Sequence, residues 1–180
     1  VAYAGGAFAL LPFSITMICA LLIQIATNLA NDYFDFIKGA DTEHRIGPVR
    51  VVQSGLIPPT TVRNVMFAVL GVTFLLGLYL VWIAGWQILL IGLASLLCAV
   101  LYTAGPWPLA YVGLGDVFVF LFFGIVAVTG THFVQAQHWS FEALLASIPI
   151  GALSTAILVV NNYRDIDTDT MTGKRTLAVR

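Results

Sequence analysis

The chain has 180 residues, of which 59% are hydrophobic and only 9% are charged, and its formal net charge is -1 at pH 7. A soluble domain carries about 25% charged residues, so this composition excludes a water-soluble globular protein. We therefore expect an all-α, polytopic transmembrane helical bundle whose surroundings are the lipid bilayer, with no nucleic acid as partner.

Five apolar stretches approach the length of about 20 residues that a membrane-spanning helix needs. Short turn-forming or polar segments separate them, and all four tryptophans stand at their ends, where an indole ring meets the lipid headgroups. We interpret residues 1–10 as the tail of an earlier span. The predicted spans are residues 11–31, 64–83, 86–103, 116–134 and 141–161.

Charge is confined almost entirely to two polar segments, one after the first predicted span and one after the last. Between residues 64 and 163 only Asp116 and Glu142 are charged. An even number of predicted crossings separates the two segments, so both face the same side of the membrane. Since they hold every basic residue, the positive-inside rule predicts that this side is the cytoplasm. The basic residues are Lys38, Arg45, Arg50, Arg63, Arg164, Lys174, Arg175 and Arg180.

Each polar segment contains an amide side chain followed by two carboxylates at helical spacing, which places the three on one helix face. The local strings also echo each other, as "NDYFD" at residues 31–35 and "NNYRD" at residues 161–165. The first set is Asn28, Asp32 and Asp35, and the second is Asn161, Asp165 and Asp169.

Several carboxylates at the edge of the hydrocarbon repel one another and need a compensating cation. Mg²⁺ prefers oxygen ligands and is commonly bound by one or two carboxylates together with substrate phosphates. Two facing sets of carboxylates therefore predict a magnesium–diphosphate site, while a merely solvated juxtamembrane loop is the alternative for any single acid. The basic residues expected to neutralise the diphosphate are Lys38, Arg45, Arg50, Lys174 and Arg175.

Three strings extend this pattern to a known family. "NDYFDFIKGAD", the "RIGPVR" that follows it and the later "NNYRDIDTDTMTGKRTLAVR" resemble the two aspartate-rich motifs of the UbiA superfamily of intramembrane prenyltransferases. The resemblance implies a nine-helix bundle in which the second motif follows the sixth helix. Residues 1–180 would then form a single transmembrane prenyltransferase domain that runs from the end of helix one to just after helix six, a fragment lacking its start and its C-terminal helices.

The resemblance also implies an activity and a set of site residues. Gly39 stands where the general first motif has its third aspartate, and Asp41 follows two residues later. This variant, with the "GPVR" string and "YTAGPWPLAYVGLGD", resembles the branch that transfers a polyprenyl group from polyprenyl diphosphate to 1,4-dihydroxy-2-naphthoate, with decarboxylation, in menaquinone biosynthesis. A bacterial plasma membrane is the implied location. The implied catalytic residues are Asp32, Asp35, Asp165 and Asp169, and the implied Mg²⁺ ligands add Asp41, Asn28 and Asn161.

Three other functions compete with this interpretation. A related enzyme that prenylates 4-hydroxybenzoate shares the diphosphate site and differs in its aromatic pocket. A cation-coupled transporter also places acids in membrane helices, but near the bilayer midplane rather than at its edge. A CDP-alcohol phosphotransferase uses one compact aspartate motif, whereas the two motifs here are about 130 residues apart.

Overall fold

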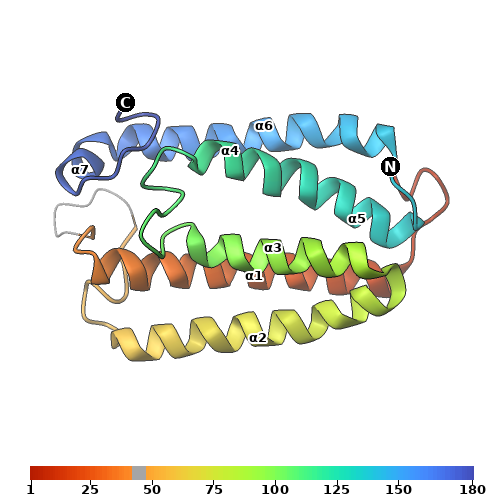
Figure 1. The fold of residues 1–180 in the computed structure, drawn as a ribbon, viewed down its shortest axis with the longest axis horizontal. Helices are drawn as coiled ribbons and strands as arrows, with labels where there is room; N and C mark the ends of the chain where they lie inside the picture. The colour runs from red at the N-terminus through yellow and green to blue at the C-terminus, as the bar shows by residue number, and fades with distance from the viewer. Residues whose placement is uncertain (42–47) are drawn as a thin grey trace.

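The structure, a computed structural model, describes residues 1–41 and 48–180. In this part of the chain every regular element is helical and there is no strand, which confirms the predicted all-α bundle. The long helices run side by side in two layers, with α1, α2 and α3 in one and α4, α5 and α6 in the other (Figure 1).

The first layer follows the predicted spans closely. Helix α1 (Leu10–Ile37) continues about one and a half turns beyond the predicted end, so it carries the whole first aspartate string. Helix α2 (Pro59–Ala84) begins with a proline at its first position, where the missing N–H costs nothing. Gly85, with φ 88°, then turns the chain directly into α3 (Trp86–Leu101). At 16 residues α3 is about 24 Å long, shorter than the other long helices.

The second layer contains a helix with a π-helical segment and a second helix with a proline, Pro149, in its interior. Helices α4 (Gly115–Val119) and α5 (Ala127–Ala136) are joined by η1 (Phe120–Val126), a π-helical segment, into one continuous 22-residue element. Helix α6 (Phe141–Arg164) is capped by Ser140, whose hydroxyl accepts the Ala143 N–H at 3.1 Å. A short helix, α7 (Ile166–Met171), follows it.

The π-helical segment packs directly on α6 through two glycines. A Cβ added at Gly124 would lie 2.5 Å from the Gly151 Cα, so the two backbones touch and no side chain fits between them. A π-helical turn commonly marks a place where a helix adjusts its register to a neighbour or a site. The contact holds η1 and α6 close together in the second layer.

Four helices, α1, α2, the α4–α5 element and α6, are long and apolar enough to cross a membrane. Many of their large apolar side chains point outward, which suits contact with lipid. The four tryptophans are also exposed, from 53% at Trp139 to 81% at Trp82, as the predicted aromatic belt requires. Residues 1–9 differ from the prediction: they form turns rather than the end of a helix, and the Ala9 N–H is anchored on Gln135 at 2.7 Å.

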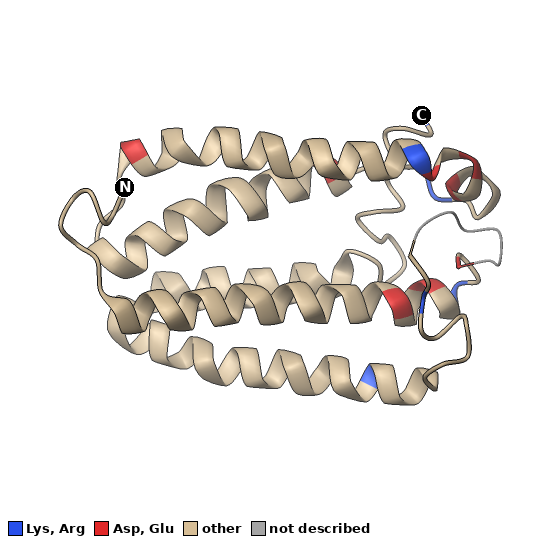
Figure 2. Cartoon of the chain, turned by 180° about the vertical axis from the view of Figure 1, so that it is seen from behind, with Lys and Arg blue, Asp and Glu red and all other residues tan. Residues whose placement is uncertain are grey.

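Nearly all described charged side chains gather at one end of the bundle (Figure 2). The end of α1, the loop before α4 and the segment that follows α6 all lie there, whereas the start of α6, whose first turn contains Glu142, lies at the opposite end (Figures 1 and 2). The described parts of the two polar segments therefore lie at the same end of the bundle, in agreement with the prediction that they share one side.

Candidate active site

Asp35 lies at the centre of the charged end. It stands in the last turns of α1 and is only 2% exposed. Its Oδ1 accepts a hydrogen bond from the Tyr111 hydroxyl at 2.8 Å, and its Oδ2 forms an ion pair with the Lys174 Nζ at 3.0 Å. Both partners come from distant parts of the sequence, so Asp35 joins the first motif to the second.

Asp32, one turn earlier on α1, is 6% exposed and binds backbone. Its two carboxylate oxygens accept the N–H groups of Val51 and Val52 at 3.2 and 3.3 Å. These bonds hold the segment before α2 against the end of α1. The neighbouring Asn31 accepts the Thr103 hydroxyl at 3.1 Å, which ties the same helix end to the loop after α3.

The loop of residues 102–114 lies against the end of α1. Lys38, which directly follows α1, donates from its Nζ to the carbonyls of Thr103 at 2.6 Å and Gly105 at 3.3 Å. Its partial burial lowers the pKa of Lys38, and Lys174 nearby lowers it further while Asp35 opposes the shift. Asp116, just after the loop, is buried at the same end of the bundle.

The second motif departs from its predicted geometry. Helix α6 ends at Arg164, and Asp165 has φ -97° and ψ 9°, which lie outside helical values. The chain turns there into α7, so Asn161, Asp165 and Asp169 do not share one face of a continuous helix, and that expectation was wrong. The Arg164 guanidinium donates two hydrogen bonds of 2.7 Å to the Asp165 carboxylate. This acid therefore has a basic partner next to it in the chain.

The segment after α7 returns to the loop of residues 102–114. The Arg175 N–H donates to the Tyr111 carbonyl at 3.0 Å, and the Arg180 guanidinium donates to the Val112 carbonyl at 3.1 Å. Gly113, with φ +73°, has a backbone conformation that other residues rarely adopt, and an added Cβ would lie in a tight contact, 3.0 Å from the Arg175 carbonyl oxygen. This close approach of the two segments places Lys174 beside Asp35.

Two tyrosines stand between the motifs. Burial is the main reason that the pKa of Tyr111 is raised, and the charge and hydrogen bond of Asp35 add to it. Burial likewise raises the pKa of Tyr102, assisted by the carboxylates of Asp116, Asp35 and Asp169. Both phenols therefore keep their protons at neutral pH, and Tyr111 donates its proton to Asp35 in a hydrogen bond.

A cavity of about 490 Å³ extends from this end into the bundle between the two layers. Asn28, Asn31, Asn161 and Tyr102 line it near the charged end, and most of the remaining lining is aliphatic or aromatic. Its α1 lining begins at Thr16, so the cavity follows about 22 Å of that helix. The two asparagines predicted as metal ligands thus lie where the acidic end meets an apolar interior.

The oxygen donors at this end fit Mg²⁺, which prefers carboxylate and amide oxygens. Among the described residues, however, no three acidic, histidine or cysteine side chains are gathered as a ready-made metal cluster. Asp41 pairs with the Arg50 Nε at 3.7 Å, and Asp35 pairs with Lys174. The predicted ligand set therefore stays a prediction, and Arg45 lies outside the described residues.

Tyr111 is the site residue that sequence reasoning missed. It belongs to the string "YTAGPWPLAY", which contributed to the family resemblance but offered no acid, base or metal ligand to which a role could be assigned. Its partners Asp35, Lys38 and Lys174 are 76, 73 and 63 positions away in the sequence. No local spacing signals such contacts.

Comparison with known proteins matches the whole chain, residues 1–180, to the UbiA prenyltransferase family. The chain is 38% identical over 170 residues to 1,4-dihydroxy-2-naphthoate octaprenyltransferase of Haemophilus influenzae, covering 91% of this chain and 55% of the relative. The proteins of the same name from Escherichia coli and Mycobacterium tuberculosis are 40% and 42% identical, over 92% and 89% of this chain and 56% and 55% of those relatives.

The chain therefore spans about half the length of the curated relatives it matches. No solved structure matches it significantly. The relatives and the four long apolar helices together establish an integral membrane protein.

Proposed function

We propose that this chain, which belongs to the UbiA prenyltransferase family, forms the diphosphate-binding half of an enzyme. The enzyme transfers a polyprenyl group to 1,4-dihydroxy-2-naphthoate. Decarboxylation accompanies the transfer and gives demethylmenaquinone. The observation that carries the proposal is the ion pair between Asp35 and Lys174, which joins the two aspartate motifs at the mouth of an apolar cavity. The names of the curated relatives support the choice of acceptor.

The four catalytic aspartates would hold magnesium at the diphosphate end of the substrate. Asp32, Asp35, Asp165 and Asp169 are the principal ligands, with Asp41, Asn28 and Asn161 as further candidates. Bound Mg²⁺ supplies positive charge to the diphosphate as the allylic carbon–oxygen bond breaks. The ion pair between Lys174 of the second segment and Asp35 of the first supports one diphosphate site shared by both segments.

Basic side chains compensate the remaining phosphate charge. Lys38 and Lys174 already lie beside Asp35 and Tyr111, while Arg50 and Arg175 flank them on neighbouring segments. Arg45 is the fifth expected member of this set. Arginine adds bidentate contacts to phosphate oxygens, and lysine adds a compact charge.

The cavity accounts for the other half of the substrate. Its apolar walls suit an isoprenoid chain, and they keep water from the allylic cation until the aromatic carbon attacks it. The asparagines and Tyr102 at its mouth mark the place where the diphosphate end and the apolar tail meet. A long prenyl chain extends from there into the surrounding lipid.

We further propose that the charged end faces the cytoplasm of a bacterial plasma membrane. The basic residues concentrate at that end, as the positive-inside rule requires. A membrane-impermeant maleimide added outside intact cells should then fail to label a cysteine placed at exposed Thr170 and should label one placed at exposed Gln137. The reverse pattern would refute this orientation.

The decisive experiment is an assay of the protein expressed from its complete gene and purified in detergent. A polyprenyl diphosphate is offered with either 1,4-dihydroxy-2-naphthoate or 4-hydroxybenzoate, with and without Mg²⁺. Magnesium-dependent prenylation of the naphthoate, lost in Asp32→Ala and Asp165→Ala, is the expected result. Transfer to hydroxybenzoate alone would keep the metal site and overturn the acceptor. Transfer to neither would overturn the proposed reaction and direct attention to cation transport.

A further inference from the structure

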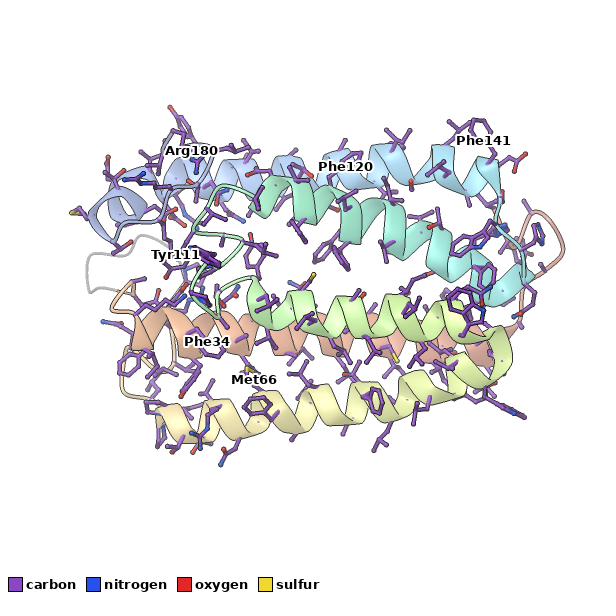
Figure 3. All side chains as sticks on the ribbon, viewed as in Figure 1. Phe34, Met66, Tyr111, Phe120, Phe141 and Arg180 are labelled. Atoms are coloured by element: carbon purple, nitrogen blue, oxygen red, sulfur yellow. The ribbon has the colours of Figure 1, made fainter. Side chains whose placement is uncertain are left out.

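Tyr111 contacts the charged groups of both aspartate motifs although it belongs to neither. We infer that Tyr111 is a positioning residue of the diphosphate site, which fixes the carboxylate of Asp35 and holds the ammonium groups of Lys38 and Lys174 beside it. This inference rests on the proposed function, because it concerns how the proposed site is assembled. The side chain projects from the loop before α4 into the space between the two layers (Figure 3).

The first step concerns the two oxygens of Asp35. Oδ1 accepts from the neutral Tyr111 hydroxyl at 2.8 Å, and Oδ2 contacts the charged Lys174 Nζ at 3.0 Å. An incoming divalent cation competes with the ammonium group for the same negative charge, but a neutral hydroxyl donor does not compete in this way. Tyr111 therefore holds the orientation of the carboxylate while its ionic partner is exchanged, as second-shell hydrogen bonds do for metal ligands.

The second step concerns the ring of Tyr111. The Nζ atoms of Lys38 and Lys174 lie 4.7 and 5.1 Å from its centroid, within the range of cation–π attraction. Two ammonium groups repel each other, and this repulsion contributes to the lowered pKa of Lys38. The ring and the nearby carboxylate compensate that repulsion, so two cations are kept together where a diphosphate needs them.

The third step concerns the backbone of the loop, which fixes Tyr111 itself. Its N–H donates to the Pro108 carbonyl at 2.9 Å, and its carbonyl accepts the Arg175 N–H at 3.0 Å. A residue held by its own loop and by the segment after the second motif has little freedom to reorient. Asp35 thus receives its hydrogen bond from a rigid donor.

The test is Tyr111→Phe, which removes only the hydroxyl, in the protein expressed from its complete gene. Binding of inorganic diphosphate is measured by isothermal titration calorimetry at increasing Mg²⁺ concentrations. Loss of a second-shell partner typically costs about 10- to 100-fold in metal affinity, so the Mg²⁺ concentration for half-maximal binding should rise by about that factor. The melting temperature in EDTA verifies that the variant is folded. Tyr163→Phe is the matched control, since Tyr163 is 74% exposed at the same end of the bundle.

A double-mutant cycle separates positioning from a general structural effect. In an Asp35→Asn background, adding Tyr111→Phe should leave the Mg²⁺ requirement unchanged, because the carboxylate on which Tyr111 acts is gone. An equal rise in both backgrounds, or no rise in either, overturns the role of Tyr111. If the wild-type protein binds diphosphate equally well without Mg²⁺, the proposed function itself fails. A magnesium-dependent wild type with an unaffected Tyr111→Phe variant refutes the positioning role alone.

Discussion

At the end of α1 the string "NDYFD" places its two acids inside the protein, whereas at the end of α6 the similar "NNYRD" leaves its acid near the surface. Asp35 is 2% exposed and takes its partners from residues 111 and 174. Asp165 forms an ion pair with the residue directly before it, Arg164. The two strings differ at two positions, and at one of them Phe34 occupies the place that Arg164 has in the second string. Asp35 has no base directly beside it in the chain, and its ion pair with Lys174 joins the two motifs.

The strongest test of this difference is Asp35→Ala. We expect prenyl transfer to fall by about 100- to 1,000-fold, the typical loss when a group that stabilises developing charge is removed. Stability should fall as well, by about 3 kcal/mol, because removing one partner of a buried ion pair strands the other. Radiolabelled prenyl transfer and chemical unfolding in detergent measure the two effects. Asp167→Ala, at an exposed position of α7, is the control, and near-normal activity in Asp35→Ala would refute the assignment.

Asp165→Ala should separate function from stability. We expect transfer to fall by about 100-fold, because a charge-stabilising group is lost. The free energy of unfolding should change by less than about 1 kcal/mol, since the Arg164 side chain is partly exposed and water can solvate its guanidinium group. The same two assays apply. Destabilisation as large as that of Asp35→Ala would show that the two motifs are buried alike.

Lys174→Met leaves the Asp35 carboxylate without its ammonium partner. Hydrogen bonds to charged groups contribute about 1.5–3 kcal/mol, so we expect a loss of stability in that range when the protein is unfolded in EDTA. Added Mg²⁺ should restore part of it by replacing the lost charge. Arg175→Met, at an exposed neighbouring position, is the control for stability. Equal destabilisation with and without Mg²⁺ would contradict the idea that Mg²⁺ can take the position of the Lys174 ammonium group beside Asp35.

Arg164→Phe converts the second string to the residue type of the first and should have the smallest effect. Exposed ion pairs contribute about 0–1 kcal/mol and weaken with salt. We therefore expect a drop in melting temperature that is slight in dilute buffer and disappears in concentrated NaCl. A large drop that salt does not change would mean that this pair is part of a buried network.

Much of the bundle could be predicted from the sequence because lipid leaves few choices. An apolar stretch in a bilayer must satisfy its backbone hydrogen bonds within a helix, so the long helices appeared near their expected residues. The aspartates and lysines at the charged end could be named because charge is scarce in the chain. The end of α6 was different: Arg164 holds Asp165 at a non-helical turn, and a periodic spacing of acids does not reveal such a turn.

The sequence alone determined the membrane helices, the common side of the two polar segments and the family, since each depends on local composition or on recognisable strings. Only the tertiary structure decided the partners of the acids. Asp32 binds the backbone of Val51 and Val52, and Asp35 binds Tyr111 and Lys174, through contacts that span 19 to 139 residues of chain. These contacts depend on how the loops return to one end of the bundle, because a buried carboxylate accepts whichever donors the packing brings to it.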